Sequence, residues 1–464
     1  MDYTRDERDL LRLGKKPVLK RNFGFMSILG FSCTVLITWE GMLIWVSMLA
    51  PDSSRHFLSY IAGWMTFAGW QAATASAAYL TGTVLQSIII MVRSDYISQP
   101  WQAMLFLWAI LAFAVFINTV ASKTLSYFEG LVLVLHILGF FGIMIPLVSL
   151  APHANASFFT TFANAGGWPT QGLSFMVGLP TSVFSLIGAD SAVHMAEEIK
   201  DASTVVPRTI MISIMLNGVQ GFAMMVAYLF CLGDLEAVLE SQETLGYPFL
   251  FVLQSGTRST AGAAVMGLVL VVLAICSAVG ILASSSRMLW SFARDRGVPL
   301  WKMFTKLASR TSVPIYAIAF TTVVSLLLSL IILGSSVAFN NIVNLSVVGL
   351  YSSYLLSCGL LLWRRLQPGC ILPYDPQITM VGPKSLHWGP WRIPGIAGIA
   401  NNVFACIYLF VLLFWAFWPP ATPVFAQNMN FSILTFGSMV FFAVIWYFIQ
   451  GRKEYKGPIV EVEL

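Results

Sequence analysis

Eleven apolar runs, each long enough to cross a bilayer, constrain the fold of this chain more than any other feature. A bilayer core of about 30 Å requires about 20 apolar residues in a helix. The runs lie at residues 23–44, 57–80, 101–121, 125–150, 173–196, 209–232, 261–286, 313–334, 337–363, 396–418 and 431–450. They predict an all-α polytopic membrane protein.

Composition excludes the main alternatives. Charged residues make up only 10% of the chain, against about 25% in soluble proteins, so the chain cannot be a soluble enzyme. With 14% aromatic residues it is not a disordered chain either. The net charge of +5 comes from basic residues in short loops, so we expect no nucleic-acid partner. Six scattered cysteines match neither a disulfide framework nor a zinc site, and we expect no metal or other cofactor.

The loops are too short to form separate domains. We expect a basic, cytoplasmic-type tail at residues 1–22, one transporter domain at 23–450 and a cytoplasmic tail at 451–464. The polar N-terminal segment shows no removable signal peptide. No Walker A pattern is present and no loop could hold an ATPase, so the chain is not expected to be an enzyme.

Lysine and arginine are retained on the cytoplasmic side of membranes, and here they orient the last ten runs. With the C-terminus inside, seventeen basic residues fall inside and only Arg93 and Arg258 fall outside. The seven basic residues of the N-terminal tail also belong inside, as does Arg55, yet a single run separates them. Either the tail is forced outside, or the first run fails to span, or a helix is missing near residues 40–45. We favour the missing helix.

Several segments resemble fungal amino-acid permeases. They are FGFMSILGFSCTVLITWEG at Phe23–Gly41, PTSVFSLIGADSAVHMAEEIKDASTVVPRTI at Pro180–Ile210, WVSMLAP at 45–51, GWQAA at 69–73 and the tail GRKEYKGPIVEVEL. Over essentially its whole length the chain resembles the GABA/choline permease group of the amino acid–polyamine–organocation superfamily. The resemblance implies a LeuT-like inverted-repeat bundle. Of the family's twelve helices about eleven are expected here, because the second is absent between Gly41 and Trp45.

The resemblance implies a secondary active transporter, a symporter that takes up a small amine-bearing solute by alternating access. The solute would be an amino acid, GABA or choline, coupled to protons, and the membrane would be the plasma membrane or, alternatively, that of the vacuole. A non-transporting membrane sensor and a nonfunctional helix-deleted product are the rival interpretations. Because the missing helix would adjoin both broken helices, we expect this form to show little or no uptake.

Transporters of this architecture bind substrate at the midplane, where two helices are broken. Breaks need flexible backbone, so glycine and serine within apolar runs mark the candidates, which coincide with the family's unwound segments. The candidate substrate-binding residues are Gly30, Phe31, Ser32, Cys33 and Thr34 in the first run and Gly188, Ala189, Asp190 and Ser191 in the fifth. The alternative is that the glycines only ease helix packing.

Ionisable and aromatic residues extend this candidate site. Asp190 could bind a substrate ammonium or a helix end, and Glu40 could bind an amine unless it lies at a membrane boundary. Phe184 resembles the family's aromatic gate, with an ordinary core phenylalanine as the alternative. Related transporters without sodium carry a basic side chain on the helix of His136, which is therefore the proton-coupling candidate. A hydrogen-bonded core histidine is the alternative there.

A polar cluster follows the fifth run. His194, Glu197 and Glu198 share a helix face, but the cluster lacks the second histidine of a zinc site. We expect the two glutamates to pair with Lys200 or Arg208 at a cytoplasmic gate.

Three further polar groups are expected to be structural. Arg294–Arg296 is expected only to orient the chain, and Glu129, near the cytoplasmic end of its run, is expected to be structural. The polar stripe at Tyr351–Tyr354 is expected to pack between helices, with the lining of a cavity as the alternative.

Overall fold

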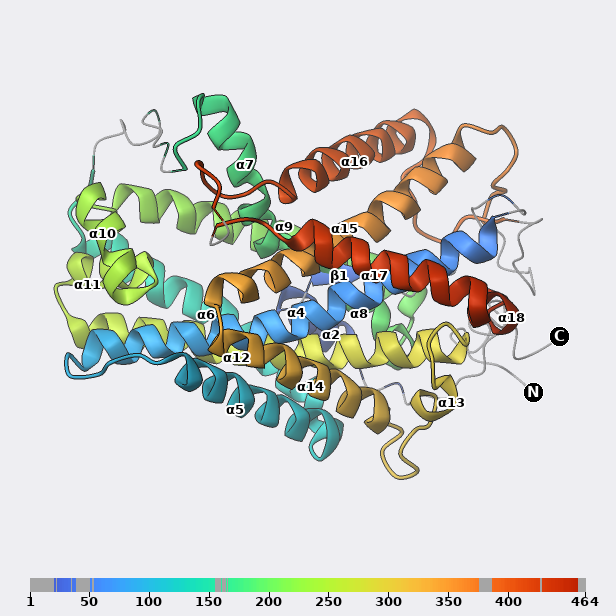
Figure 1. Cartoon of the computed structure of the whole chain (residues 1–464), viewed down its shortest axis with the longest axis horizontal. Coiled ribbons are helices and arrows are strands. Elements are labelled where there is room, and N and C mark those ends of the chain that lie inside the picture. Colours follow the sequence, from blue (N-terminus) through green and yellow to red (C-terminus); the bar gives the residue numbers. More distant parts are fainter. Residues whose placement is uncertain are drawn as a thin grey trace.

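A computed structural model describes residues 21, 23–34, 36–38, 51, 54–154, 160, 164, 166–374, 386–425 and 428–457. Within these ranges nine helical segments are long and apolar enough to cross a membrane (Figure 1). Their α-helices are α4 (Arg55–Val92), α5 (Pro100–Thr119), α6 (Leu125–Leu150), α9 (Ala202–Phe230), α12 (Thr260–Arg294), α14 (Ile315–Ser329), α15 (Ser336–Arg365), α16 (Gly395–Ala416) and α17 (Ser432–Trp446). The prediction of an all-α polytopic protein is confirmed.

Short elements cap and connect these helices. They are η1 (Ser122–Thr124), α10 (Leu235–Leu245), α11 (Pro248–Thr257), α13 (Trp301–Phe304), η5 (Leu330–Leu333), η6 (Tyr447–Gly451) and α18 (Arg452–Glu454). Helices suit this chain because backbone groups in lipid must find their hydrogen bonds within the segment. Large apolar side chains such as Leu131, Phe404 and Phe441 are exposed on the outside of the bundle, where acyl chains would contact them.

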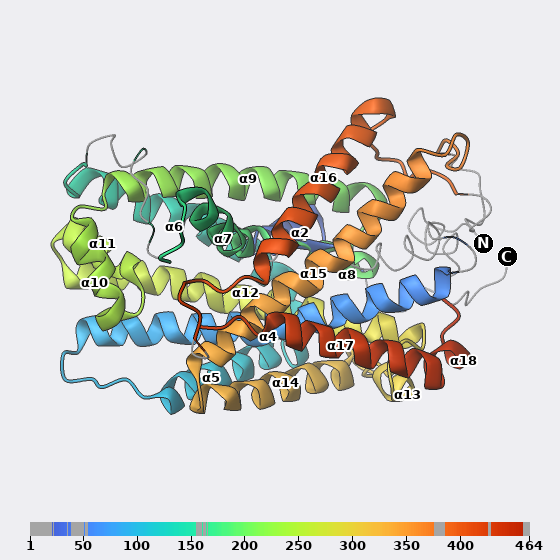
Figure 2. The same ribbon diagram turned by 45° about the horizontal axis from the view of Figure 1, so that its top comes forward.

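The two ends of the bundle differ in charge. One end, to the right in Figures 1 and 2, holds the start of α4, the ends of α12 and α15, and α13 and α18. We call it the basic end, because these elements and the turn after α12 carry Arg55, Arg287, Arg294, Arg296, Lys302, Arg364, Arg365 and Arg452. The opposite end holds α10 and α11 with the acidic Asp234 segment. The distribution of lysine and arginine predicted that these loops lie on the same side of the membrane. In the structure they lie at the same end of the bundle.

The described part of the first apolar run, residues 23–34 and 36–38, does not cross the bundle. Its helix, α2 (Phe25–Thr34), has only 10 residues and is followed by the short strand β1 (Leu36–Thr38). Ten residues span about 15 Å, half of a bilayer core. Phe23 N donates to Glu198 O at 3.1 Å, and Lys200 N donates to Phe23 O at 3.2 Å, so α2 begins at the basic end beside Glu198.

β1 then turns the chain back. It pairs in parallel with β2 (Gly188–Asp190), and β2 leads along the chain toward Glu198 at the basic end. Arg21, which donates to the Ile199 carbonyl, and the start of α4 at Arg55 therefore lie at the same end. Of the three alternatives for the basic tail, the described part of the first run, residues 23–34 and 36–38, agrees with the one in which this run fails to span. The missing family helix stays a prediction, and it is compatible with this path.

The fifth run crosses as a broken helix. It consists of α7 (Gln171–Val183), η3 (Phe184–Leu186), β2, α8 (Ser191–His194) and η4 (Ala196–Glu198). Gly188 has a φ of 127°, a backbone conformation that favours glycine, so the predicted break lies where this glycine permits it. Nine long helices and this broken segment give ten crossings within the described ranges instead of the eleven expected.

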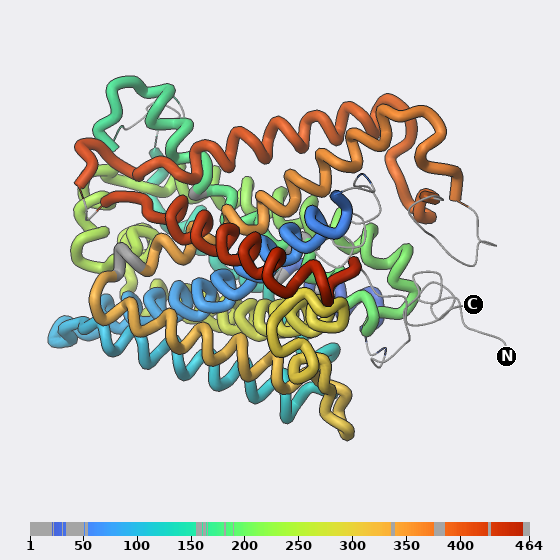
Figure 3. The backbone as a smooth tube through the Cα atoms, turned by 45° about the vertical axis from the view of Figure 1, so that its right-hand side comes forward, coloured from blue at the N-terminus to red at the C-terminus, as the bar shows by residue number. Residues whose placement is uncertain are grey.

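Helix α4 forms the axis of the bundle. It packs along α12 and α15, and Figure 3 shows its blue tube running the length of the molecule with the yellow α12 beside it. Gly69 of α4 meets Gly349 of α15 so closely that a Cβ on Gly349 would lie 2.9 Å from the Gly69 Cα. Small residues let helix backbones approach at such crossings.

Candidate functional site

The break in the fifth run surrounds a buried carboxyl group. Asp190 ends β2 and is fully buried, and the Tyr354 hydroxyl of α15 donates to its Oδ1 at 2.8 Å. His194 lies one turn further on, with Nε2 3.4 Å from Asp190 Oδ2. The Trp70 ring of α4 meets the His194 ring edge-on, with centroids 5.2 Å apart. We call Trp70, Asp190, His194 and Tyr354 the central cluster.

This arrangement suits the binding of a cation or a proton. Ionisable side chains inside a membrane protein are costly and mark functional sites by default. A carboxyl group held by one hydroxyl retains further acceptor capacity, and the strand conformation of β2 interrupts the helical hydrogen bonds around it. Within the described ranges no group of three His, Cys, Asp or Glu side chains could hold a metal ion.

The sequence predicted Asp190 and His194 but missed their partners. Trp70 was noticed only within the GWQAA segment, and Tyr354 was expected to pack between helices. Both lie far from Asp190 along the chain, on helices that only the folded bundle brings together. The signal that could have identified Tyr354 is its place in a polar stripe facing the interior of the bundle.

The first run reaches the break through β1, which follows the predicted residues. Leu36 pairs with Gly188, and Ile37 pairs with Asp190, so β1 lies against the break. The predicted residues Gly30, Phe31, Ser32, Cys33 and Thr34 all lie within helix α2, and the break follows them at Leu36. Their placement in the broken segment was therefore wrong by a few residues. Glu40 lies outside the described residues.

The side chains of α2 nevertheless carry one unsatisfied polar group. Phe31 packs edge-on against Phe23 at a centroid distance of 6.2 Å, as a core residue would. Ser32 is fully buried, and its hydroxyl has no hydrogen-bond partner among the described residues. Asn217 of α9 donates to the Cys33 carbonyl at 3.3 Å and so holds the end of α2.

Three other fifth-run candidates surround the break. Phe184 is half-buried in η3, before the break, and packs against an apolar cluster that includes Tyr351 and Leu409. Ala189 lies in β2, and Ser191 begins α8, where it is fully buried. The gate role of Phe184 and its alternative as a core residue therefore both remain open.

His136 lies away from the central cluster, at the contact of α6 with α9. Its Nε2 is 3.0 Å from Gln220 Oε1, so its partner is a side-chain amide. Gln220 lies on α9 three residues after Asn217, the residue that holds the Cys33 carbonyl. His136 therefore contacts the helix that holds the end of α2.

The glutamates after the break pair with α12 and not with their neighbours in sequence. Arg287 Nε donates to Glu198 Oε1 at 3.1 Å, and Arg294 Nη1 donates to Glu197 Oε1 at 2.7 Å. The predicted partners Lys200 and Arg208 are exposed. The expectation that Glu197 and Glu198 pair with Lys200 or Arg208 was therefore wrong, as was the purely orienting role given to Arg294.

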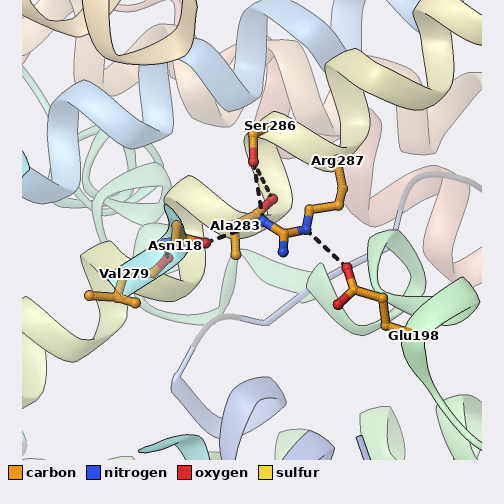
Figure 4. Close-up of polar contacts among 6 residues, drawn as sticks. All are labelled: Asn118, Glu198, Val279, Ala283, Ser286 and Arg287. Atoms are coloured by element: carbon orange, nitrogen blue, oxygen red, sulfur yellow. Dashed lines mark hydrogen bonds and ion pairs between the residues drawn. The ribbon is translucent and has the colours of Figure 1, made fainter. Parts of the chain in front are cut away.

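Arg287 is the centre of this network (Figure 4). It is 2% exposed, and it also donates to Asn118 Oδ1 at 3.2 Å. Asn118 in turn donates to the Val279 carbonyl at 2.9 Å. The apolar run ends at residue 286, but the helix continues to Arg294, which places Arg287 and Arg294 seven residues apart on roughly one face. We call the pairs Glu198–Arg287 and Glu197–Arg294 the ion-pair gate.

Within the described residues, ten crossings, one of them broken around a buried carboxyl group, define a multi-pass membrane protein. The chain matches the model of the amino acid permease family over residues 23–440. It therefore belongs to the amino acid permease family, and it is a multi-pass membrane transporter, as the sequence predicted.

Relatives agree with this assignment. The chain is 26% identical to the choline transporter of Saccharomyces cerevisiae over 418 residues, which cover 89% of this chain and 70% of the relative. It is 24% identical to an uncharacterized amino-acid permease of Schizosaccharomyces pombe, covering 99% and 90%. A structure of Mhp1, a nucleobase-cation-symport-1 family transporter, matches with 12% identity, 95% and 92% coverage and a TM-score of 0.37. That last likeness is too slight to support an argument.

Proposed function

We propose that the chain belongs to a proton-coupled symporter for a small amine-bearing solute, an amino acid, GABA or choline, that works by alternating access. The observation that carries the proposal is Asp190, a fully buried acceptor at the break of the fifth run. An ammonium group is the natural partner for such an acceptor. Relatives include proteins named choline transporter and amino-acid permease.

Substrate binding would use both broken segments. The ammonium would lie at Asp190, whose hydrogen bond from Tyr354 fixes the direction of the carboxyl group. The buried, unpartnered Ser32 hydroxyl offers a second polar contact among the described residues. Phe184, half-buried before the break, would close over the bound solute.

The ion-pair gate would close the basic end. Both glutamates follow the break on the same segment, and both arginines lie on α12. Access from this end requires the segment after Asp190 to separate from α12, which breaks both pairs at once. Proton coupling would act through His136, because a change in its charge alters its hydrogen bond with Gln220 of α9, the helix whose Asn217 holds the end of α2.

The short helix in the first run indicates that the 464-residue chain has low uptake activity. In a midplane site two broken helices each cross the membrane, whereas α2 turns back at β1. A nonfunctional helix-deleted product is therefore the second candidate, and a non-transporting sensor is the third. A fluorescent fusion would distinguish the expected plasma membrane from the vacuolar membrane.

Uptake of radiolabelled GABA and choline in a permease-null yeast tests the proposal. The 464-residue chain is compared with a form in which the family's second helix is restored between Gly41 and Trp45. In the restored form Asp190→Asn should abolish uptake and Tyr354→Phe should reduce it several-fold, because each removes part of the ligand site. Glu240→Gln, an exposed change in α10, is the matched control. Full uptake by Asp190→Asn would contradict the proposal.

A further inference from the structure

A shallow groove opens on the outer surface near the basic end. It is lined by Phe25 at the start of α2, by Arg208, Met211 and Ile212 of α9, and by Trp391 in the connection between α15 and α16. The four apolar side chains are 39% to 45% exposed. Three separate parts of the chain thus build one apolar wall beside a single cation.

The groove carries a positive charge. Among the described residues that line it, Arg208 is the one charged side chain, and it is exposed. Arg392, which follows Trp391 in the chain, is exposed as well, with its guanidinium 5.5 Å from the Trp388 ring centroid. The nearby acids Glu197 and Glu198 face α12, where Arg294 and Arg287 bind them.

We propose that this groove binds one anionic phospholipid, with the headgroup phosphate at Arg208 and an acyl chain along Met211, Ile212 and Phe25. A free phosphate would make no contact with the apolar wall, and a neutral lipid would bring no net negative charge to Arg208. Aromatic side chains such as Trp391 occupy the headgroup level of membranes, and basic pockets between helices bind anionic headgroups.

Binding there would stabilise the closed basic end. Phe25 follows two residues after Phe23, whose backbone bonds to Glu198 and Lys200 on either side of Ile199. A lipid held between Phe25 and α9 would therefore fix α2 against the segment that carries the ion-pair gate. The inference concerns the fold of the chain and does not depend on which solute is transported.

Native mass spectrometry and thermal unfolding of the purified full chain test the inference. In nanodiscs of phosphatidylcholine with added phosphatidylserine, we expect phosphatidylserine to stay bound and to raise the unfolding temperature. Arg208→Gln should reduce that binding about fivefold, the contribution of one cation near an anionic surface. Trp391→Ala should reduce it as well, while Arg310→Gln, an exposed arginine at the same end, should leave it unchanged.

Three results would overturn the inference. Arg208→Gln could retain as much phosphatidylserine as the unmodified chain. Phosphatidylcholine alone could stabilise the chain equally, which would remove the need for the charge. Inorganic phosphate in detergent could raise the unfolding temperature as much as the lipid does, which would show that the site binds a free anion and not a lipid.

Discussion

Arg287 shows at the scale of a single residue how the sequence could identify a cluster and still miss its partner. Glu198 is separated from Arg287 by 89 residues, so reasoning from neighbours along one helix selected Lys200 and Arg208. Spacing along one helix predicts contacts between residues three or four positions apart. It does not predict contacts with a different helix such as α12. Asp190, by contrast, was predictable, because an acid inside an apolar run is conspicuous in any sequence.

Breaking one side of the Glu198–Arg287 pair should destabilise the protein. Arg287→Ala leaves Glu198 largely buried and without this partner, at a cost of about 3–5 kcal/mol. The double variant Arg287→Ala with Glu198→Ala removes both charges and should recover part of that loss. Thermal unfolding in detergent compares these two variants, with Lys302→Ala, on the short helix α13, as the control. Equal losses for the single and double variants would contradict a coupled pair.

At the scale of elements, the apolar runs predicted the long helices because lipid imposes the same rule on each of them. The two broken runs were harder. Gly188 marked one break correctly, since glycine alone tolerates its φ readily. In the first run Gly30 lies inside α2, and the helix ends at Thr34 for a reason that flexible residues do not reveal: β1 pairs with β2.

A side chain added at the crossing of α4 with α15 should destabilise the protein. Gly349→Ala places a Cβ 2.9 Å from both the Gly69 Cα and the Met65 carbonyl oxygen, so the two helices must separate. We expect a clear fall in the unfolding temperature and in the yield of folded protein. Gly359→Ala is the matched control on the same helix, because its Cβ would meet nothing within 4 Å. If the two variants unfolded alike, the crossing would not depend on its glycines.

The segment after α17 should hold the basic end together. Tyr455 is almost fully buried, its hydroxyl donates to Ser59 Oγ at 3.0 Å, and its ring lies 5.3 Å from that of Tyr60 and 6.1 Å from that of Phe292. Tyr455→Ala should cost about 3–5 kcal/mol, as large aromatic truncations do. Tyr455→Phe should cost only about 1 kcal/mol, the value of one hydrogen bond.

Unfolding temperatures of the two Tyr455 variants separate packing from hydrogen bonding at this contact. Tyr127, which is exposed on α6, provides the control substitution Tyr127→Ala. A small effect of Tyr455→Ala would mean that the tail packs on the bundle without stabilising it.

For the whole molecule, the distribution of lysine and arginine was the most informative property of the sequence. It placed the loops that connect the last ten runs at the correct ends of the bundle. It also showed that an arrangement with eleven crossings is inconsistent at the first run. It could not choose between a run that does not span and a helix that is absent, because both leave the tail and Arg55 on one side. The alignment with the S. pombe relative extends over 516 residues, so that permease has segments that these 464 residues lack.

Restoring the family's second helix between Gly41 and Trp45 should change the path of the first run. With a second crossing available, the run can traverse the membrane and return, so the basic tail and Arg55 keep their side while the first run becomes a full broken helix. We expect uptake to rise from background together with this change. A cysteine introduced at Gly41 in a cysteine-free background should then react with an impermeant thiol reagent on intact cells, and only in the restored form.

Cysteine labelling at two other positions provides the controls for the labelling at position 41. Ser98→Cys, in the loop between α4 and α5 at the end opposite the basic end, should be labelled in both forms. Lys123→Cys, between α5 and α6, should be labelled in neither, because it lies at the basic end. Equal labelling at position 41 in the two forms would show that the first run already spans, and that the charge of the tail does not decide its side.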